Sequence, residues 1–123
     1  MPMFTDIFEA YGMDYFRTME RFMGNEKLYL KLLDMLFQDD NLKKLGDALN
    51  SGNMAGAFEA AHTLKGVSAN MGLTALYNAV CALVEPLRRS EKSAEYPILY
   101  QAVLTEFDRV DAMRKQLKGE AQP

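Results

Sequence analysis

The chain's single histidine, His62, lies in a stretch with helical periodicity, and Lys65 and Gly66 follow it one helical turn further on. Imidazole near its pKa is a good nucleophile toward phosphorus, and the phosphoramidate that it forms is labile enough to be passed on. A lysine one turn away supplies a cation that can reach a phosphoryl group on that ring. These residue types at this spacing indicate a phosphoryl carrier, whereas a single histidine removes any site that needs two.

The surroundings of His62 are unusual for the outer face of a helix. On a helical wheel, the core face comprises Ala57, Ala60, Ala61, Leu64, Val67, Ser68 and Met71, and His62 falls close to opposite its centre. Gly66 shares the outer face with His62, although a glycine in a helix costs about 1 kcal/mol relative to alanine. Its missing side chain would let another surface approach the histidine. Because exposed apolar residues often mark a docking surface, we predict that a partner contacts Ala55, Phe58, Glu59 and Ala69.

The other parts of a kinase are missing from the sequence. Its glycines form neither a Walker pattern nor a GxGxxG loop, and no carboxylate cluster indicates a magnesium site. We therefore predict a passive carrier that is not an enzyme and needs no cofactor or metal of its own. The plainest alternative is that His62 is an ordinary surface residue, as a lone exposed histidine usually is.

Composition narrows the class of protein. With 123 residues the chain has room for one domain with a real core, and 49% hydrophobic and 25% charged residues are ordinary for a globular protein. A net charge of −3 argues against an electrostatic nucleic-acid binder. One cysteine cannot form an internal disulfide, and neither a secretory signal nor a membrane-spanning run is present. We expect a reduced, cytoplasmic protein without nucleic-acid or membrane partners.

The elements that must position His62 are all expected to be helices. Apolar residues recur at spacings of three and four, and no proline lies between residues 3 and 85. We predict helices over about 4–11, 14–23, 26–49, 53–71, 75–89 and 97–117, with Asn25, Asn53 and Thr74 as N-caps, Gly12, Gly24 and Gly72 as ends, Pro97 in a first turn and Pro86 as a kink. The predicted fold is an antiparallel up-down four-helix bundle with a short extra N-terminal helix. We expect residues 1–123 to form one domain, with the bundle over about 13–117 and a frayed tail at 118–123.

The predicted core is rich in methionine and aromatic side chains. At helical spacing these residues are usually bundle core, although a ligand pocket is the alternative. The predicted inward positions before the turn at Gly52 are Phe4, Ile7, Phe8, Tyr11, Tyr15, Phe16, Met19, Phe22, Met23, Leu28, Leu32, Met35, Leu36, Leu42, Leu45 and Leu49.

The stretch from His62 to Gly72, HTLKGVSANMG, resembles the H-x-L-K-G-x-S-x-x-x-G signature of histidine-containing phosphotransfer (HPt) domains, at every signature position. These domains are the carriers of multistep two-component phosphorelays, and their fold is an antiparallel four-helix bundle. The resemblance covers roughly residues 4–117. One departure is that Val84 stands where many members have a glutamate after a leucine, with Glu85 one place late, and Pro86 is unusual there.

The resemblance implies a role for each matching residue. His62 would be phosphorylated, Lys65 would hydrogen-bond the phosphoryl oxygens, and Gly66 would clear space for the partner. Ser68 and Gly72 look structural. Arg88 lies where some members place a second basic residue near the phosphoryl group, so we add it to the predicted docking residues.

The implied function is that of a stand-alone phosphorelay carrier. It would accept a phosphoryl group on His62 from a receiver-domain aspartate and pass it to another receiver. The implied partners are response-regulator receiver domains and a hybrid histidine kinase, Mg²⁺ would belong to the receiver alone, and we expect a monomer. The alternatives are a receiver-docking module that is not phosphorylated, the phosphorylatable domain of a split sensor kinase system, and an unrelated helical ligand-binding protein.

Overall fold

The computed structural model describes residues 3–119, and all regular secondary structure within this range is helical. The helices are α1 (Phe4–Ala10), α2 (Tyr15–Glu20), α3 (Glu26–Gln38), α4 (Asn41–Ser51), α5 (Met54–Asn70), α6 (Thr74–Arg88) and α7 (Tyr96–Leu117). The predicted all-α class is confirmed. No helix within residues 3–119 combines the length and the apolar composition that crossing a membrane requires.

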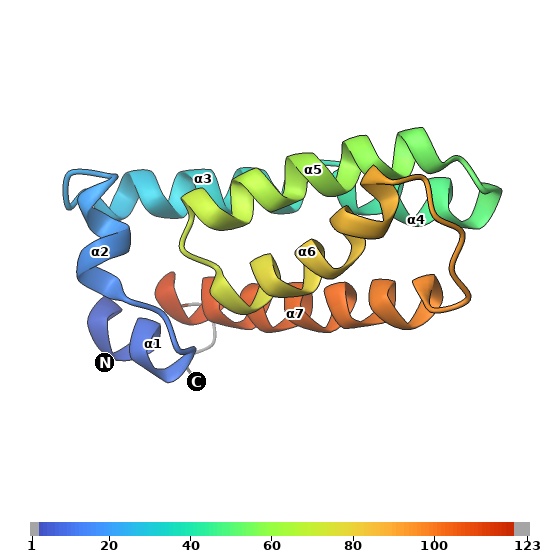
Figure 1. The fold of residues 1–123 in the computed structure, drawn as a ribbon. Helices are drawn as coiled ribbons and strands as arrows, with labels where there is room; N and C mark the ends of the chain where they lie inside the picture. Colours follow the sequence, from blue (N-terminus) through green and yellow to red (C-terminus); the bar gives the residue numbers. More distant parts are fainter. Residues whose placement is uncertain (1–2, 120–123) are drawn as a thin grey trace.

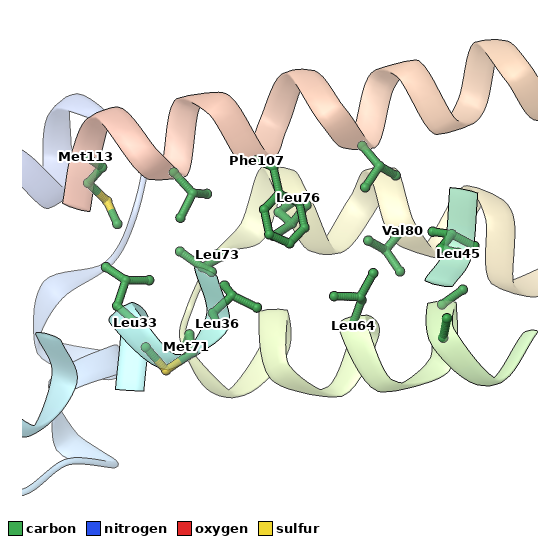
Figure 2. Packing of buried hydrophobic residues seen from close by; sticks show 14 of the residues in the cluster. Leu33, Leu36, Leu45, Leu64, Met71, Leu73, Leu76, Val80, Phe107 and Met113 are labelled. Carbon is green, nitrogen blue, oxygen red and sulfur yellow. The ribbon is translucent and has the colours of Figure 1, made fainter. Parts of the chain in front are cut away.

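The predicted antiparallel four-helix bundle is also confirmed. Helix α5 packs on α4 and α6, α6 packs on α7, and α7 contacts both α3 and α4 (Figure 1). Helices α3 and α4 lie one after the other and together occupy one of the four positions in the bundle. Side chains from α3 to α7 point into a common interior, which includes Leu33, Leu45, Leu64, Leu76, Val80 and Met113 (Figure 2).

The prediction of one long helix over 26–49 is wrong, because the chain breaks at Asp39 and Asp40 between α3 and α4. One carboxylate oxygen of Asp39 accepts hydrogen bonds from the backbone N–H of Asn41 at 3.1 Å and from its side-chain amide at 2.6 Å. Short polar side chains that bond to nearby backbone groups compete with helical hydrogen bonds. Asp39 itself has extended backbone, with a ψ of 150°.

The N-terminal segment contains two short helices, α1 and α2, where helices over about 4–11 and 14–23 were predicted. Helices α1 and α2 lie at the end of the bundle where α5 finishes (Figure 1). Arg21, which follows α2, donates hydrogen bonds to the carbonyls of Ala69 and Asn70 at 3.1 and 3.2 Å. The buried hydroxyl of Tyr29, whose pKa is raised by that burial, donates to the Met71 carbonyl at 2.8 Å. These hydrogen bonds fix the C-terminal end of α5 to the residue after α2 and to α3.

Three predicted core residues are exposed instead. Phe16, Met23 and Met35 have 75%, 89% and 52% of their surface accessible. Helix α2 ends at Glu20, so the helical spacing used for Met23 does not extend that far, and Met23 lies in a turn with a φ of 53°. On the short α2 the buried residues are Thr18 and Met19, which leaves Phe16 on the outer side.

Two of the three predicted N-caps are confirmed, whereas α2 ends at Glu20, before the predicted end at Gly24. The side chains of Asn25 and Asn53 accept hydrogen bonds from the N–H groups of Leu28 and Gly56, each at 3.0 Å. The predicted cap Thr74 is instead the first residue of α6, and Leu73 takes the N-cap position without a side-chain hydrogen bond.

Two prolines and the last described residues also bear on the predicted helix boundaries. Pro97 lies in the first turn of α7 and Pro86 lies inside α6. Of the predicted frayed tail, Lys118 still donates to both oxygens of Asp34 at 3.1 Å. Residues 120–123 lie outside the described residues.

Candidate functional site

Helix α5 presents a buried face and an open face, as the wheel predicted. Its fully buried residues are Ala57, Ala60, Ala61, Leu64 and Ser68, whereas His62 is exposed in the middle of the helix. The Ser68 hydroxyl turns inward and donates to the Leu64 carbonyl at 2.7 Å. His62 therefore projects from the outside of the bundle.

The C-terminal end of α5 is fixed by a Schellman motif. The N–H of Leu73 bonds to the Ser68 carbonyl at 2.9 Å, and the N–H of Gly72 bonds to the Ala69 carbonyl at 3.2 Å. Gly72 has a φ of 71°, and a Cβ atom there would collide with the side chain of Thr18. A glycine is required at this position both for the backbone conformation and for the close approach of α2.

The ring of His62 is stacked on the ring of Phe58, one turn earlier on α5. The two ring centroids are 5.6 Å apart and the planes differ by 18°. Phe58 is half-buried and packs against the hydrophobic core. The exposed imidazole thus rests on a side chain that the core holds in place.

Lys65 and Gly66 leave the other side of His62 open. Within the part of the chain that the structure describes, the half-buried Lys65 has no acidic partner. A Cβ atom built on the exposed Gly66 would meet no atom within 4 Å. The cation is therefore available to an incoming group, and no side chain blocks the approach to the histidine at position 66.

Arg88 reaches this face from α6. Its guanidinium carbon lies 5.3 Å from the centroid of the Phe58 ring, and its Nε is 3.2 Å from a carboxylate oxygen of Glu85. The side chain of Arg88 is 49% exposed. Glu85, which departs from the family's usual spacing, is therefore the ion-pair partner of this arginine.

The remaining predicted docking residues are exposed on the same helix. Ala55 and Ala69 lie about two turns before and after His62, and Glu59 lies within one turn of it. No ring contact, hydrogen bond or ion pair among residues 3–119 joins their side chains to His62. The backbone carbonyls of Glu59 and Ala69 are each bonded, by the Thr63 hydroxyl and by Arg21.

A groove between α3 and α5 borders Gly66, and the sequence analysis missed it. It has a volume of about 430 Å³ and is lined mainly by apolar side chains, namely Leu32, Met35, Leu36, Val67 and Met71, with Asp39 and Asn70. The sequence analysis assigned Met35 to the core. No local pattern in the sequence marked this groove, because it depends on how α3 and α5 lie beside each other in the bundle.

Within residues 3–119, no three histidine, cysteine or carboxylate side chains are close enough together to hold a metal ion. Cys81 is a free thiol on α6.

Comparison with known proteins places the chain in a family. A family model described as Hpt domain matches residues 31–119. The chain belongs to the Hpt domain family, and it is a histidine phosphotransfer module of two-component signalling. Hpt domains are phosphocarriers rather than kinases or phosphatases, and they interact with receiver domains and histidine kinases. Neither a search of curated proteins nor a search of solved structures gave a match.

Proposed function

We propose that this chain is a phosphorelay carrier that accepts a phosphoryl group on His62 from a receiver-domain aspartate and passes it to a second receiver. The observation that carries the proposal is the open face of α5. An exposed histidine lies mid-helix, and one turn away Gly66 has no atom within 4 Å of the place where its side chain would be. A receiver can therefore bring its aspartyl phosphate up to the imidazole.

The chemistry needs one displacement in each direction. A ring nitrogen of His62 attacks the phosphorus, the N–P bond forms as the P–O bond to the aspartate breaks, and the carboxylate leaves. Such transfers depend on positioning and on neutralising charge, with little further covalent chemistry for the protein. The receiver supplies Mg²⁺ at its own acidic pocket, and the carrier contributes no metal or cofactor.

Two cations flank the transferred group in this proposal. Lys65 is one turn after His62 and has no acidic partner within residues 3–119. Arg88 approaches from α6 and is bound to Glu85 on the exposed surface. Charge-assisted hydrogen bonds from these groups to phosphoryl oxygens would stabilise the phosphohistidine.

The docking face comprises Ala55, Phe58, Glu59, Gly66, Ala69 and Arg88, together with the groove beside Gly66. Apolar surface on the outside of a bundle favours association with a partner. The upstream partner is a hybrid histidine kinase and the other partners are response-regulator receiver domains. We further take the carrier to be a cytoplasmic monomer, in keeping with its unpaired Cys81.

The test is phosphorylation by a phosphorylated receiver. The chain is expected to gain a phosphate that acid removes and base does not, and His62→Gln is expected to remove all of it, because the chain has no other histidine. The variant should stay folded, since exposed substitutions usually change stability by less than about 0.5 kcal/mol. Residual labelling of a folded His62→Gln protein would exclude His62 as the carrier.

A further inference from the structure

Phe58 contacts two groups of the proposed site at once. Its ring is stacked on His62, with centroids 5.6 Å apart, and it carries the guanidinium of Arg88 at 5.3 Å. His62 and Phe58 come from α5, whereas Arg88 comes from α6. One aromatic ring thus links the nucleophile to a cation from the neighbouring helix.

Helix geometry explains the stack between the two rings of α5. Side chains of a helix lean toward its N-terminus and over the residues three and four positions earlier. The imidazole of His62 therefore leans onto position 58, where a flat aromatic side chain can support it. An interplanar angle of 18° with this separation is an offset parallel stack, which is a favoured arrangement of two rings.

Phe58 is itself held more firmly than the residue it supports. It is half-buried against the core, whereas His62 is exposed. An exposed side chain on a helix otherwise exchanges between staggered χ1 states and between orientations of its ring. The support on one side limits these rotations and leaves the other side of the imidazole open.

We infer that Phe58 is a positioning residue, whose ring holds the His62 imidazole in the orientation that attacks phosphorus and holds the Arg88 guanidinium beside it. The inference rests on the proposed function, since it deepens the role of the same site. Phe58 belongs to the proposed docking face, but its support of the His62 ring needs no partner, and Phe58 itself donates nothing to the phosphoryl group. Its contribution is therefore made even when the phosphoryl donor is a small molecule.

Phosphoramidate is the appropriate donor for the test because it needs no protein docking. A ring nitrogen of His62 attacks its phosphorus, the new N–P bond forms as the P–N bond to ammonia breaks, and the other ring nitrogen keeps its proton. The maximal rate and the half-saturating donor concentration are measured for the wild type, Phe58→Leu and Phe58→Tyr. Phe37→Leu is the matched control, since Phe37 is another half-buried phenylalanine beneath an arginine, Arg114, at 5.0 Å.

Phe58→Leu is expected to lower the maximal rate about three-fold, because the freed ring spreads over roughly that number of rotamers. The half-saturating concentration should not change, and Phe58→Tyr should restore the rate. Phe37→Leu should lower the melting temperature without slowing phosphorylation. A wild-type rate in Phe58→Leu, no rescue by tyrosine, or equal slowing in Phe37→Leu would overturn the inference.

A measurement on the unmodified protein guards against variants that fail to fold. Nuclear Overhauser effects between the ring protons of Phe58 and His62 are expected in the wild type, and their absence would overturn the inference. Failure of the proposed function has a separate signature. Phosphate that still appears on His62→Gln would contradict the proposed function. If phosphorylation requires His62 but Phe58→Leu reacts at the wild-type rate, only the positioning role of Phe58 is contradicted.

Discussion

Two arginine–phenylalanine pairs lie on different sides of the bundle. In the site on α5 and α6, Arg88 lies 5.3 Å from the Phe58 ring, which stacks on His62. Between α3 and α7, Arg114 lies 5.0 Å from the Phe37 ring, which packs edge-on against Phe107 with centroids 5.6 Å apart. The two arginine–phenylalanine distances are similar. The two pairs differ instead in the acidic residues that bind each arginine.

The anchoring of the guanidinium separates the two clusters. Arg114 donates to Asp34 at 2.7 Å and to Asp111 at 2.8 Å, and its side chain is only 18% exposed. Hydrogen bonds from Arg114 hold the pKa of both carboxyls below the ordinary value of 3.8. Arg88 has one acidic partner, Glu85, and is 49% exposed. The first arginine ties two helices together, whereas the second is free to change partner.

Among the variants compared, Lys65→Ala should cause the largest loss of phosphoryl-transfer rate while leaving the stability of the bundle unchanged. Loss of a hydrogen bond to a charged group is worth roughly 1.5–3 kcal/mol, so receiver-dependent transfer should slow about ten- to hundred-fold. The melting temperature should barely change. Lys115→Ala is the control, because Lys115 is an exposed lysine on α7. A normal transfer rate in Lys65→Ala would make Lys65 an ordinary solvated residue.

Removing each arginine in turn compares the two clusters directly. Arg114→Met should lower the free energy of unfolding by about 1–2 kcal/mol, because partly buried charged hydrogen bonds are lost, and it should leave transfer unchanged. Arg88→Met should lower it by less than about 0.5 kcal/mol, as for other exposed ion pairs, and should slow transfer from a receiver. Chemical denaturation and transfer assays check both. Equal stability losses would show that the difference in anchoring has no energetic consequence.

Acid titration should separate the same two clusters. Because the folded-state pKa of Asp34 and Asp111 is depressed below 3.8, their stabilisation is complete above that pH and is lost as the pH falls below it. Arg114→Met should flatten this part of the stability profile, whereas Arg88→Met should leave it as in the wild type. Denaturant midpoints between pH 5 and pH 2 measure the slope, and an unchanged slope in Arg114→Met would contradict the assignment.

Substitutions of Gly66 should separate a small gain in stability from a clear loss of docking. Gly66→Ala should raise the free energy of unfolding by about 0.5–1 kcal/mol through better helix propensity, since no atom lies within 4 Å of the added Cβ. Gly66→Gln should fold and react with phosphoramidate, yet transfer poorly with a receiver. Normal receiver transfer in Gly66→Gln would show that the glycine clears no space for the partner.

The features that depend on local spacing could be predicted from the sequence. The caps, the periodic small residues of α5 and Gly72 were sufficient to place His62 outward and Ser68 inward. The resemblance of the next helix to that of some family members suggested Arg88 for the site, but its contact with Phe58 depends on how α6 packs on α5, which no local pattern encodes.

Other features could not be predicted because they depend on local hydrogen bonds and turns that the periodicity of apolar residues does not reveal. The hydrogen bonds of Asp39 to Asn41 interrupt a sequence that otherwise continues to favour helix. Met35, inside α3 and before this break, lines the groove beside Gly66 rather than the core, while Tyr29, Leu33 and Leu36 take the buried positions of that helix. The turn after Glu20 likewise exposes Met23, although its spacing from the apolar residues before it is helical.

The hydrogen bonds of Arg21 to the end of α5 bear on the order in which the chain folds. Arg21 bonds to carbonyls that are 48 and 49 positions later in the sequence, whereas α5 and α6 are joined by the short turn at Gly72. Closing a long loop costs more entropy than closing a short one. The α5–α6 hairpin is therefore expected to assemble early, whereas α2 would pack against the end of α5, and α1 against α7, last. In the native state the same two short helices should open first, and their amide hydrogens should exchange with solvent before those of the helix that carries His62.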